Sequence, residues 1–254
     1  GNDGAAARTE FTVDTEAVQT IRPLGGKLMV PATDPRSGAG DFAIAYPWIQ
    51  SAPLGATHIF DAGTLNGTDL WLVGSKGLDA VAWRSLDGGA TWTAELTVPP
   101  ADSTSFNRFD FAATLNGSLY VQNVSSFTGA DPFSYAFNGT TWSQGRPVVG
   151  QWESGRRPQL VGNKLLVTTG SVGEISTLRS FDGTGSAAEL ANVVDFNVED
   201  GVAVALLADG TISKMGATGW QPVMQAPAGA SAVALSGSTI YVGTVNAQVF
   251  TASL

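Results

Sequence analysis

The sequence predicts an all-β protein made of about six repeated sheets. The first observation is a two-residue turn pair of the hairpin type that recurs six times, each time just before a short run of β-formers. The second is the spacing, because the pairs begin at residues 25, 66, 116, 162, 200 and 236 and are therefore 41, 50, 46, 38 and 36 residues apart. Repeats of this length are typical of the blades of a β-propeller. The pairs are Gly25-Gly26, Asn66-Gly67, Asn116-Gly117, Gly162-Asn163, Asp200-Gly201 and Ser236-Gly237.

Each repeat continues into further strands, which predicts four strands per blade. A third β-like segment follows each hairpin, at FAIAYPW, AVAWRS, FSYAF, STLRSF, TISKMG and AQVFTAS. In three repeats another turn leads to a tryptophan, at Trp92, Trp142 and Trp220, which we expect to open the fourth, outermost strand. Large aromatic residues at repeated positions usually fill the interface between repeats, so we interpret these three as core.

The two ends of the chain are predicted to meet. The last repeat stops at Leu254 after three strands, and residues 9–15 (TEFTVDT) alternate apolar and polar before the first repeat. We therefore predict that residues 9–15 supply the missing strand and close the propeller. The chain is then a flexible lead of residues 1–8 followed by a single propeller domain of residues 9–254. The nearest approach to a helix, residues 185–192, is long enough for one turn at most.

Composition excludes several classes of protein. With 43% hydrophobic residues, 14% charged residues, 31 Gly and 12 Pro, the chain is turn-rich and able to bury a core. A net charge of −9, with no basic cluster longer than Arg156-Arg157, argues against a nucleic-acid partner. No apolar run reaches 18 residues, so no membrane insertion is expected. The absence of Cys excludes disulfides and thiolate zinc sites, and one His without a calcium-loop motif predicts no metal and no cofactor.

The start of the sequence bears on location. It reads GNDGAAARTE, without Met and without an apolar segment of the signal-peptide type, which indicates a processed or trimmed start. Such a start is either the remainder of an export signal or a sequence left over from recombinant expression. We expect an extracellular or cell-surface protein, and the sequence does not predict its oligomeric state.

One motif resembles a known family. Residues 85–92 read Ser-Leu-Asp-Gly-Gly-Ala-Thr-Trp, which matches Ser-x-Asp-x-Gly-x-Thr-Trp at every specified position. The chain thereby resembles the Asp-box (BNR-repeat) propellers, a group that includes sialidases, and weaker copies begin at Ser180 and end at Trp142. The resemblance implies a hairpin between the two outer strands, with Asp87 binding backbone donors and Trp92 packed inward. It marks the fold and not catalysis.

The resemblance also implies where a ligand binds, namely where the innermost strands start and where the second strand turns into the third. We expect ligand-binding residues at the strand starts (Arg22, His58, Arg108 and Arg157) and in the turns (Arg36, Asp41 and Glu174). Guanidinium groups bind carboxylates, phosphates and sugar hydroxyls through planar donor pairs. Further charges at the same positions are Asp110, Arg156, Asp195 and Lys76.

Three functions remain open. The first is an exported, non-enzymatic binding propeller that recognises a glycan, another polar ligand or a protein at this face. The second is a sialidase-like, glycan-cleaving enzyme. Arg22-Pro23, Arg36 and Asp41 faintly resemble the start of a sialidase sequence. Asp34, Glu153 and Glu174 are the other candidates for the pair of carboxylates that a glycosidase needs. A sialidase also needs a nucleophilic Tyr, but all four Tyr lie in strand-like segments, which favours binding over catalysis without deciding it. The third is a scaffold or assembly component.

Overall fold

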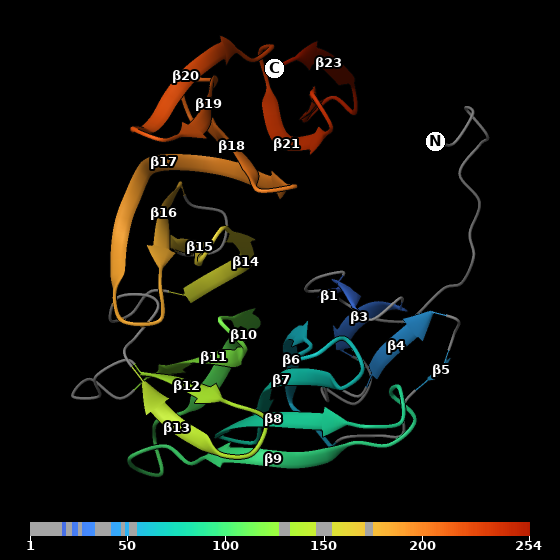
Figure 1. Cartoon of the computed structure of the whole chain (residues 1–254). Coiled ribbons are helices and arrows are strands. Elements are labelled where there is room, and N and C mark those ends of the chain that lie inside the picture. The colour runs from blue at the N-terminus through green and yellow to red at the C-terminus, as the bar shows by residue number, and fades with distance from the viewer. Residues whose placement is uncertain are drawn as a thin grey trace.

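The computed structural model describes residues 55–126, 133–145, 158–170 and 175–254, together with the strand backbones of residues 17–18, 22–24, 27–33, 42–46, 49–50 and 154–157. All regular structure in these segments is β-strand. In Figure 1 the sheets follow one another around the molecule in the order of the sequence. The described part of the chain contains no helix that is long and apolar enough to cross a membrane.

The first three blades are separate antiparallel sheets. Blade 1 contains β1 (Ala17–Val18), β2 (Arg22–Leu24), β3 (Lys27–Thr33), β4 (Phe42–Tyr46) and β5 (Ile49–Gln50). Blade 2 contains β6 (His58–Gly63), β7 (Leu70–Lys76), β8 (Asp79–Ser85) and β9 (Thr93–Val98). Blade 3 contains β10 (Asn107–Leu115), β11 (Ser118–Ser125), β12 (Ser134–Phe137) and β13 (Trp142–Gly145).

The next two blades share one long strand. Blade 4 contains β14 (Ser154–Val161), β15 (Lys164–Gly170), β16 (Ser176–Phe181) and the first part of β17 (Ser186–Glu199). The second part of β17 pairs with β18 (Val202–Leu207) and opens blade 5, which continues through β19 (Thr211–Gly216) and β20 (Gly219–Gln225). Blade 6 has three described strands, β21 (Ala230–Ser236), β22 (Thr239–Thr244) and β23 (Val249–Ser253). The predicted propeller of about six blades is therefore the observed architecture.

Left-handed backbone at the turns explains why the turn pairs located the blades. Asn116 and Gly117 have φ of 50° and 75°, and Asp200 and Gly201 have φ of 48° and 77°. Positive φ at both central residues is what a tight hairpin turn of type I′ requires, and Asn, Asp and Gly tolerate it best.

One local prediction was wrong. The pair Asn66-Gly67 does not form a two-residue turn, because the loop from Gly63 to Leu70 is wider; the Oδ1 of Asp69 accepts hydrogen bonds from the N–H groups of Leu65 and Asn66. Residues 185–192, expected to form one helical turn at most, contain no helix, because residues 186–192 begin β17 and pair with β16 in a ladder interrupted by two register shifts.

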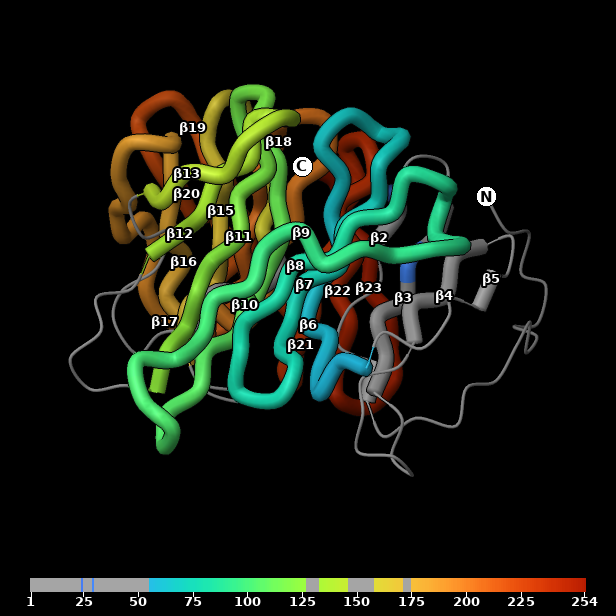
Figure 2. The backbone as a smooth tube through the Cα atoms, turned by 90° about the horizontal axis from the view of Figure 1, so that it is seen from below, coloured from blue at the N-terminus to red at the C-terminus, as the bar shows by residue number. Residues whose placement is uncertain are grey.

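Among the described residues, five apolar clusters, one between each pair of successive blades, form the core. Between blades 2 and 3, for example, Trp71 and Val73 pack against Phe109 and Phe137. The clusters between blades 1 and 2, 3 and 4, 4 and 5, and 5 and 6 are built in the same way. Figure 2 shows the strands of neighbouring sheets running alongside one another, with their loops gathered at the two ends.

The three tryptophans predicted as core lie against these clusters. Trp92 packs on the cluster between blades 1 and 2, Trp142 on the next, and Trp220 on the cluster between blades 4 and 5. Trp142 meets Trp71 of the neighbouring blade edge-on, with ring centroids 5.5 Å apart. All three are half-buried, and only Trp142 is the first residue of its strand.

Hydrogen bonds from side chains also join the innermost strands of blades 5 and 6. Alternate residues of β17 accept from alternate N–H groups of β21 and of the turn that follows it: Asp195 from Val233 at 2.8 Å, Asn197 from Leu235 at 2.9 Å and Glu199 from Gly237 at 2.8 Å. Asp61 of β6 accepts from the N–H of Ala112 in β10 in the same way. These bonds satisfy backbone donors that have no strand partner on that side.

Closure by residues 9–15 lies outside the described residues and stays a prediction. Within the described residues β23 is the edge of blade 6, where Val249 is 68% and Phe250 42% exposed. An apolar, unpaired edge strand favours pairing with another segment.

Deletion of residues 1–15 is therefore expected to lower the melting temperature and to promote aggregation, because the edge at β23 stays open. Thermal unfolding and light scattering of the full and shortened chains measure both effects. An unchanged melting temperature would remove the closure hypothesis.

Candidate binding site between blades 2 and 3

The innermost strands share an irregularity close to their starts. The pairing register shifts by a β-bulge between Ile59 and Asp61 in β6 and between Phe109 and Ala112 in β10. The innermost strands β14, β17 and β21 bulge at matching places. A bulge redirects side chains at the end of a strand, so the residues before it are turned toward the loops.

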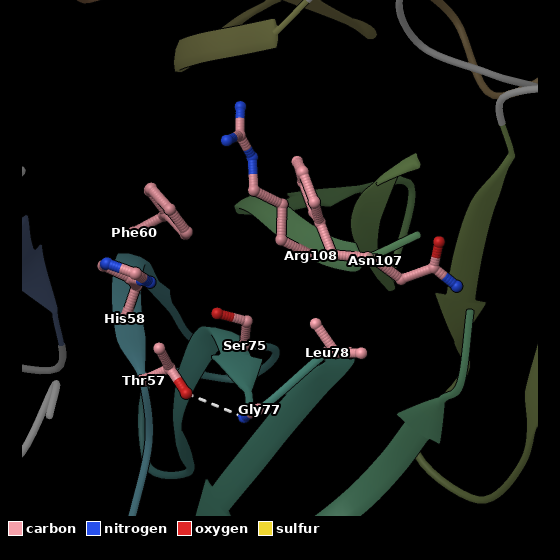
Figure 3. A pocket seen from close by; sticks show the side chains of 9 residues that line it. Thr57, His58, Phe60, Ser75, Gly77, Leu78, Asn107 and Arg108 are labelled. Carbon is pink, nitrogen blue, oxygen red and sulfur yellow. Dashed lines mark hydrogen bonds between the residues drawn. The ribbon is translucent and has the colours of Figure 1, made fainter. Parts of the chain in front are cut away.

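These strand starts and the turns from second to third strands form what we call the top face, and the opposite ends of the strands form the bottom face. A pocket of about 360 Å³ opens on the top face between blades 2 and 3. Its walls come from the start of β6, from the turn between β7 and β8, and from the start of β10 (Figure 3). The lining residues are Thr57, His58, Phe60, Ser75, Gly77, Leu78, Phe106, Asn107 and Arg108.

Hydrogen bonds hold the turn in place between the two blades. The N–H of Gly77 donates to the Thr57 Oγ1 at 2.7 Å, and the N–H of Asn107 donates to the Leu78 carbonyl at 2.8 Å. The N–H of Thr57 also donates to the carbonyl of Ser75 at 2.8 Å. All three segments of the wall are thus tied together before any ligand arrives, which lowers the entropy cost of binding.

Arg108 is held above the pocket by a carboxylate and two aromatic rings. Its Nε lies 2.7 Å from the Oδ1 of Asp110, which is almost fully buried. Its Cζ lies 5.0 Å from the ring centroid of Phe60 and 5.9 Å from that of Phe106, within the range of cation–π contacts. The His58 ring stacks on Phe60 with centroids 5.7 Å apart. The arrangement combines a positive charge with apolar surface.

The structure brings together two of the seven predicted site residues. His58 and Arg108 line the same pocket, although 50 residues separate them in the sequence. The backbones of Arg22 and Arg157 lie in β2 and β14, and their side chains are outside the described residues. The predicted residues Arg36, Asp41 and Glu174 also lie outside the described residues.

The apolar walls were missed because the sequence was searched for charged groups. Phe60 follows His58 by two residues, and Phe106, the residue just before β10, precedes Arg108 by two; the alternation of an extended chain predicts each ring beside the charged group. That alternation was the available signal. Asp110 and Asp195, expected as charges at the top face, are instead buried, because each serves as a hydrogen-bonding partner within the packed strands.

The motif at residues 85–92 forms the turn between β8 and β9 on the bottom face. Asp87 accepts from the hydroxyl of Thr91 at 2.6 Å, from the N–H of Thr91 at 2.9 Å and from the hydroxyl of Ser85 at 2.7 Å. These bonds, the Thr91 hydroxyl first, hold the pKa of Asp87 well below its ordinary value of 3.8. Asp182, in the weaker copy, accepts from Thr184 and has its pKa lowered to about 2.

A lowered carboxyl pKa in the folded state predicts a loss of stability in acid. The stabilisation from Asp182 is fully present above pH 3.8, the ordinary value, and is lost as the pH falls toward 2. The unfolding free energies of the wild type and of Asp182→Asn are therefore expected to converge over that interval. Urea unfolding at a series of pH values measures this. A difference that stays constant down to pH 2 would contradict the hydrogen-bonded turn.

Within the described residues, no three His, Asp or Glu side chains converge to hold a metal ion. The pocket itself contains one imidazole and no carboxylate among its lining residues. The lining combines a guanidinium, an imidazole, the hydroxyls of Thr57 and Ser75, and apolar side chains.

The repeated four-stranded meanders and the clusters between them define a β-propeller. No protein-family model matches the sequence. No curated protein matches it either. Three solved structures of propeller proteins are similar to it. YCF48 bound to a D1 peptide has a TM-score of 0.52 at 18% identity, covering 77% of this chain and 63% of that chain.

The second is the SapL1 lectin in complex with alpha methyl fucoside, with a TM-score of 0.51 at 13% identity, covering 94% of this chain and 97% of that chain. The third is Saccharomyces cerevisiae Sqt1, with a TM-score of 0.56 at 12% identity, covering 96% of this chain and 84% of that chain. The chain spans less than two thirds of YCF48. At these identities the likeness shows the fold alone.

Proposed function

We propose that this chain is a non-enzymatic binding propeller that holds its ligand in the top-face pocket between blades 2 and 3. The observation that carries the proposal is the convergence of His58, Phe60 and Arg108 from two blades on one preformed hollow. Concave sites with apolar walls and a few placed polar groups are the usual form of ligand sites. A peptide and a sugar are bound in two of the similar propellers, which supports binding as the function.

Glycan cleavage is the alternative, and the pocket does not favour it. A glycosidase needs two carboxylates that face the scissile bond, and the pocket lining contains neither Asp nor Glu. The nearby carboxylate of Asp110 is bonded to the Nε of Arg108.

The experiment is a paired screen of a glycan array and a peptide array. Arg108→Gln and Phe60→Ala are compared with Lys164→Gln, which removes the same charge at the bottom-face turn between β14 and β15. Ligands are expected to bind the wild type and Lys164→Gln equally and to bind the two pocket variants at least tenfold more weakly. Ligands whose binding is unchanged in both pocket variants would place the site elsewhere. Turnover of a glycoside that Asp41→Ala or Glu174→Ala abolishes would establish an enzyme.

We further propose membership of the Asp-box group and export from the cell. The complete match at residues 85–92 and the hydrogen bonds around Asp87 support the first. Fractionation of the native cells tests export, and recovery of the protein from the cytosol alone would contradict it.

A further inference from the structure

We infer that Asn116 is a site of spontaneous covalent modification, at which the side-chain amide is lost and an aspartate or isoaspartate is left in the turn between β10 and β11. The inference is independent of the proposed function. It follows from a comparison of the three Asn-Gly pairs in the sequence, at residues 66, 116 and 138. All three pairs are exposed, but they differ in the hydrogen bonds that hold them.

An Asn-Gly pair can react with itself, and asparagine is accordingly among the thermolabile residues. The backbone nitrogen of the glycine attacks the Cγ of the asparagine. A new C–N bond forms, and the amide nitrogen leaves as ammonia with the proton of the attacking nitrogen. Water then opens the cyclic imide at either carbonyl, which gives aspartate or isoaspartate. Glycine permits the attack because it has no Cβ in the way and its backbone reaches many conformations.

Hydrogen bonds hold both reacting groups of the first pair. The Oδ1 of Asn66 accepts from the N–H and the hydroxyl of Thr68, at 3.0 and 2.8 Å. It also accepts from the N–H of Asp69 at 3.1 Å. The attacking group, the N–H of Gly67, donates to the Oγ1 of Thr64 at 2.8 Å. These bonds must break before the nitrogen can reach the side chain.

The third pair is held through its side chain and by packing. The Oδ1 of Asn138 accepts from the N–H groups of Thr140 and Thr141, each at 2.9 Å. The turn also lies against blade 2, because a Cβ at Gly139 would be 3.6 Å from the Cδ2 of Leu65. Loss of two hydrogen bonds is expected to slow the reaction by about tenfold or more.

The second pair lacks these restraints. Within the described part of the chain, the side chain of Asn116 makes no hydrogen bond. The ladder between β10 and β11 ends at the pair of Leu115 and Ser118, so the N–H of Gly117 lies outside it. A Cβ at Gly117 would meet nothing within 4 Å, which leaves room for the turn to change conformation. Local opening of this turn therefore breaks none of the bonds that restrain the other two asparagines.

The modification changes a turn on which blade 3 depends. Isoaspartate carries the main chain through the former side-chain carbon and adds one atom to the chain between the paired strands. The turn sets the register of a hairpin, and this hairpin supplies Phe109, Leu119 and Val121 to the cluster between blades 2 and 3. Isoaspartate in place of Asn116 is therefore expected to lower the melting temperature.

The three pairs serve as controls for one another, because the reacting dipeptide is the same in each. The folded protein is incubated at mildly alkaline pH, and samples are digested with pepsin in acid so that no conversion occurs during preparation. Tandem mass spectrometry measures the conversion of each asparagine with time. Incubation in urea gives the rates without the fold. In Asn116→Gln the amide stays but would have to close a six-membered ring, and thermal unfolding confirms that this variant is folded.

We expect Asn116 to convert at least tenfold faster than Asn66 and Asn138 in the folded protein, with aspartate and isoaspartate as products, and the three rates to converge in urea. Asn116→Gln is expected to remove the fast conversion and to leave the other two rates unchanged. Equal rates at the three pairs of the folded protein overturn the inference, as does faster conversion at Asn66 or Asn138. An Asn116 that stays unmodified in the folded protein overturns it as well, whatever its rate in urea.

Discussion

Replacement of Trp71 by alanine is expected to lower the free energy of unfolding by about 3–5 kcal/mol, the range for a fully buried large aromatic residue. Trp71 is 0% exposed at the junction of blades 2 and 3. Its ring lies 5.1 Å from that of Phe137, with the guanidinium of Arg84 5.2 Å above it, and its Nε1 donates to the Oδ2 of Asp69 at 2.9 Å. Removal of the indole leaves a cavity, and the Asp69 carboxylate and the Arg84 guanidinium lose their contacts with it. Urea unfolding of the variant measures the loss.

Trp92→Ala is the matched control for that measurement. Trp92 is also a tryptophan beside an interface between blades, but it is half-buried, and its Nε1 donates within its own turn, to the carbonyl of Gly89 at 3.1 Å. Its replacement is expected to cost less than that of Trp71 and to leave binding at the pocket unchanged. Equal losses for the two variants would contradict the burial that separates them.

Gly74→Val is expected to destabilise the protein by about 3 kcal/mol or more, at or above the upper end for overpacking. A Cβ at position 74 would lie 1.9 Å from the carbonyl oxygen of His58 and 3.0 Å from the Cα of Ile59. Both atoms belong to the backbone of β6, so no side-chain rotation relieves the contact. The start of β6 must move, and His58 and Phe60 move with it. Chemical denaturation measures the stability, and titration with a pocket ligand measures the loss of binding.

Gly185→Ala provides the comparison, because a Cβ at that position meets nothing within 4 Å and its backbone is not left-handed. Stability and binding are expected to stay at the wild-type level. If Gly74→Val also left stability and binding unchanged, that result would contradict the close approach of β6 and β7 beside the pocket.

Local turn chemistry made most of the fold predictable. Asn116-Gly117 and Asp200-Gly201 require positive φ, and that requirement is visible in the residue types alone. The long strand β17 was not predictable in the same way, because its first part gains its structure from pairing with β16, a contact that composition does not encode. The bulges near the starts of the innermost strands likewise depend on register between strands.

The site was predictable only in part. The start of an innermost strand is readable from the repeat, and this placed His58 and Arg108 on the same face. Which neighbouring residues complete the pocket depends on the angle between blades 2 and 3, which packing around Trp71 and Phe109 sets. Charge alone did not show that Arg108 lines the pocket whereas Asp110 is buried, because burial at a bulge is a property of the folded strand.

The most direct test of the proposed site uses the single histidine of the chain, His58, which lines the pocket. In protein labelled only at histidine, the imidazole signals in an NMR spectrum come from this one residue and need no assignment. The ligand recovered from the arrays is titrated into the labelled protein. If the ligand binds between blades 2 and 3, the imidazole signals shift and saturate with the same dissociation constant as binding. Imidazole signals that stay unchanged while the ligand saturates the protein would contradict a binding site between blades 2 and 3.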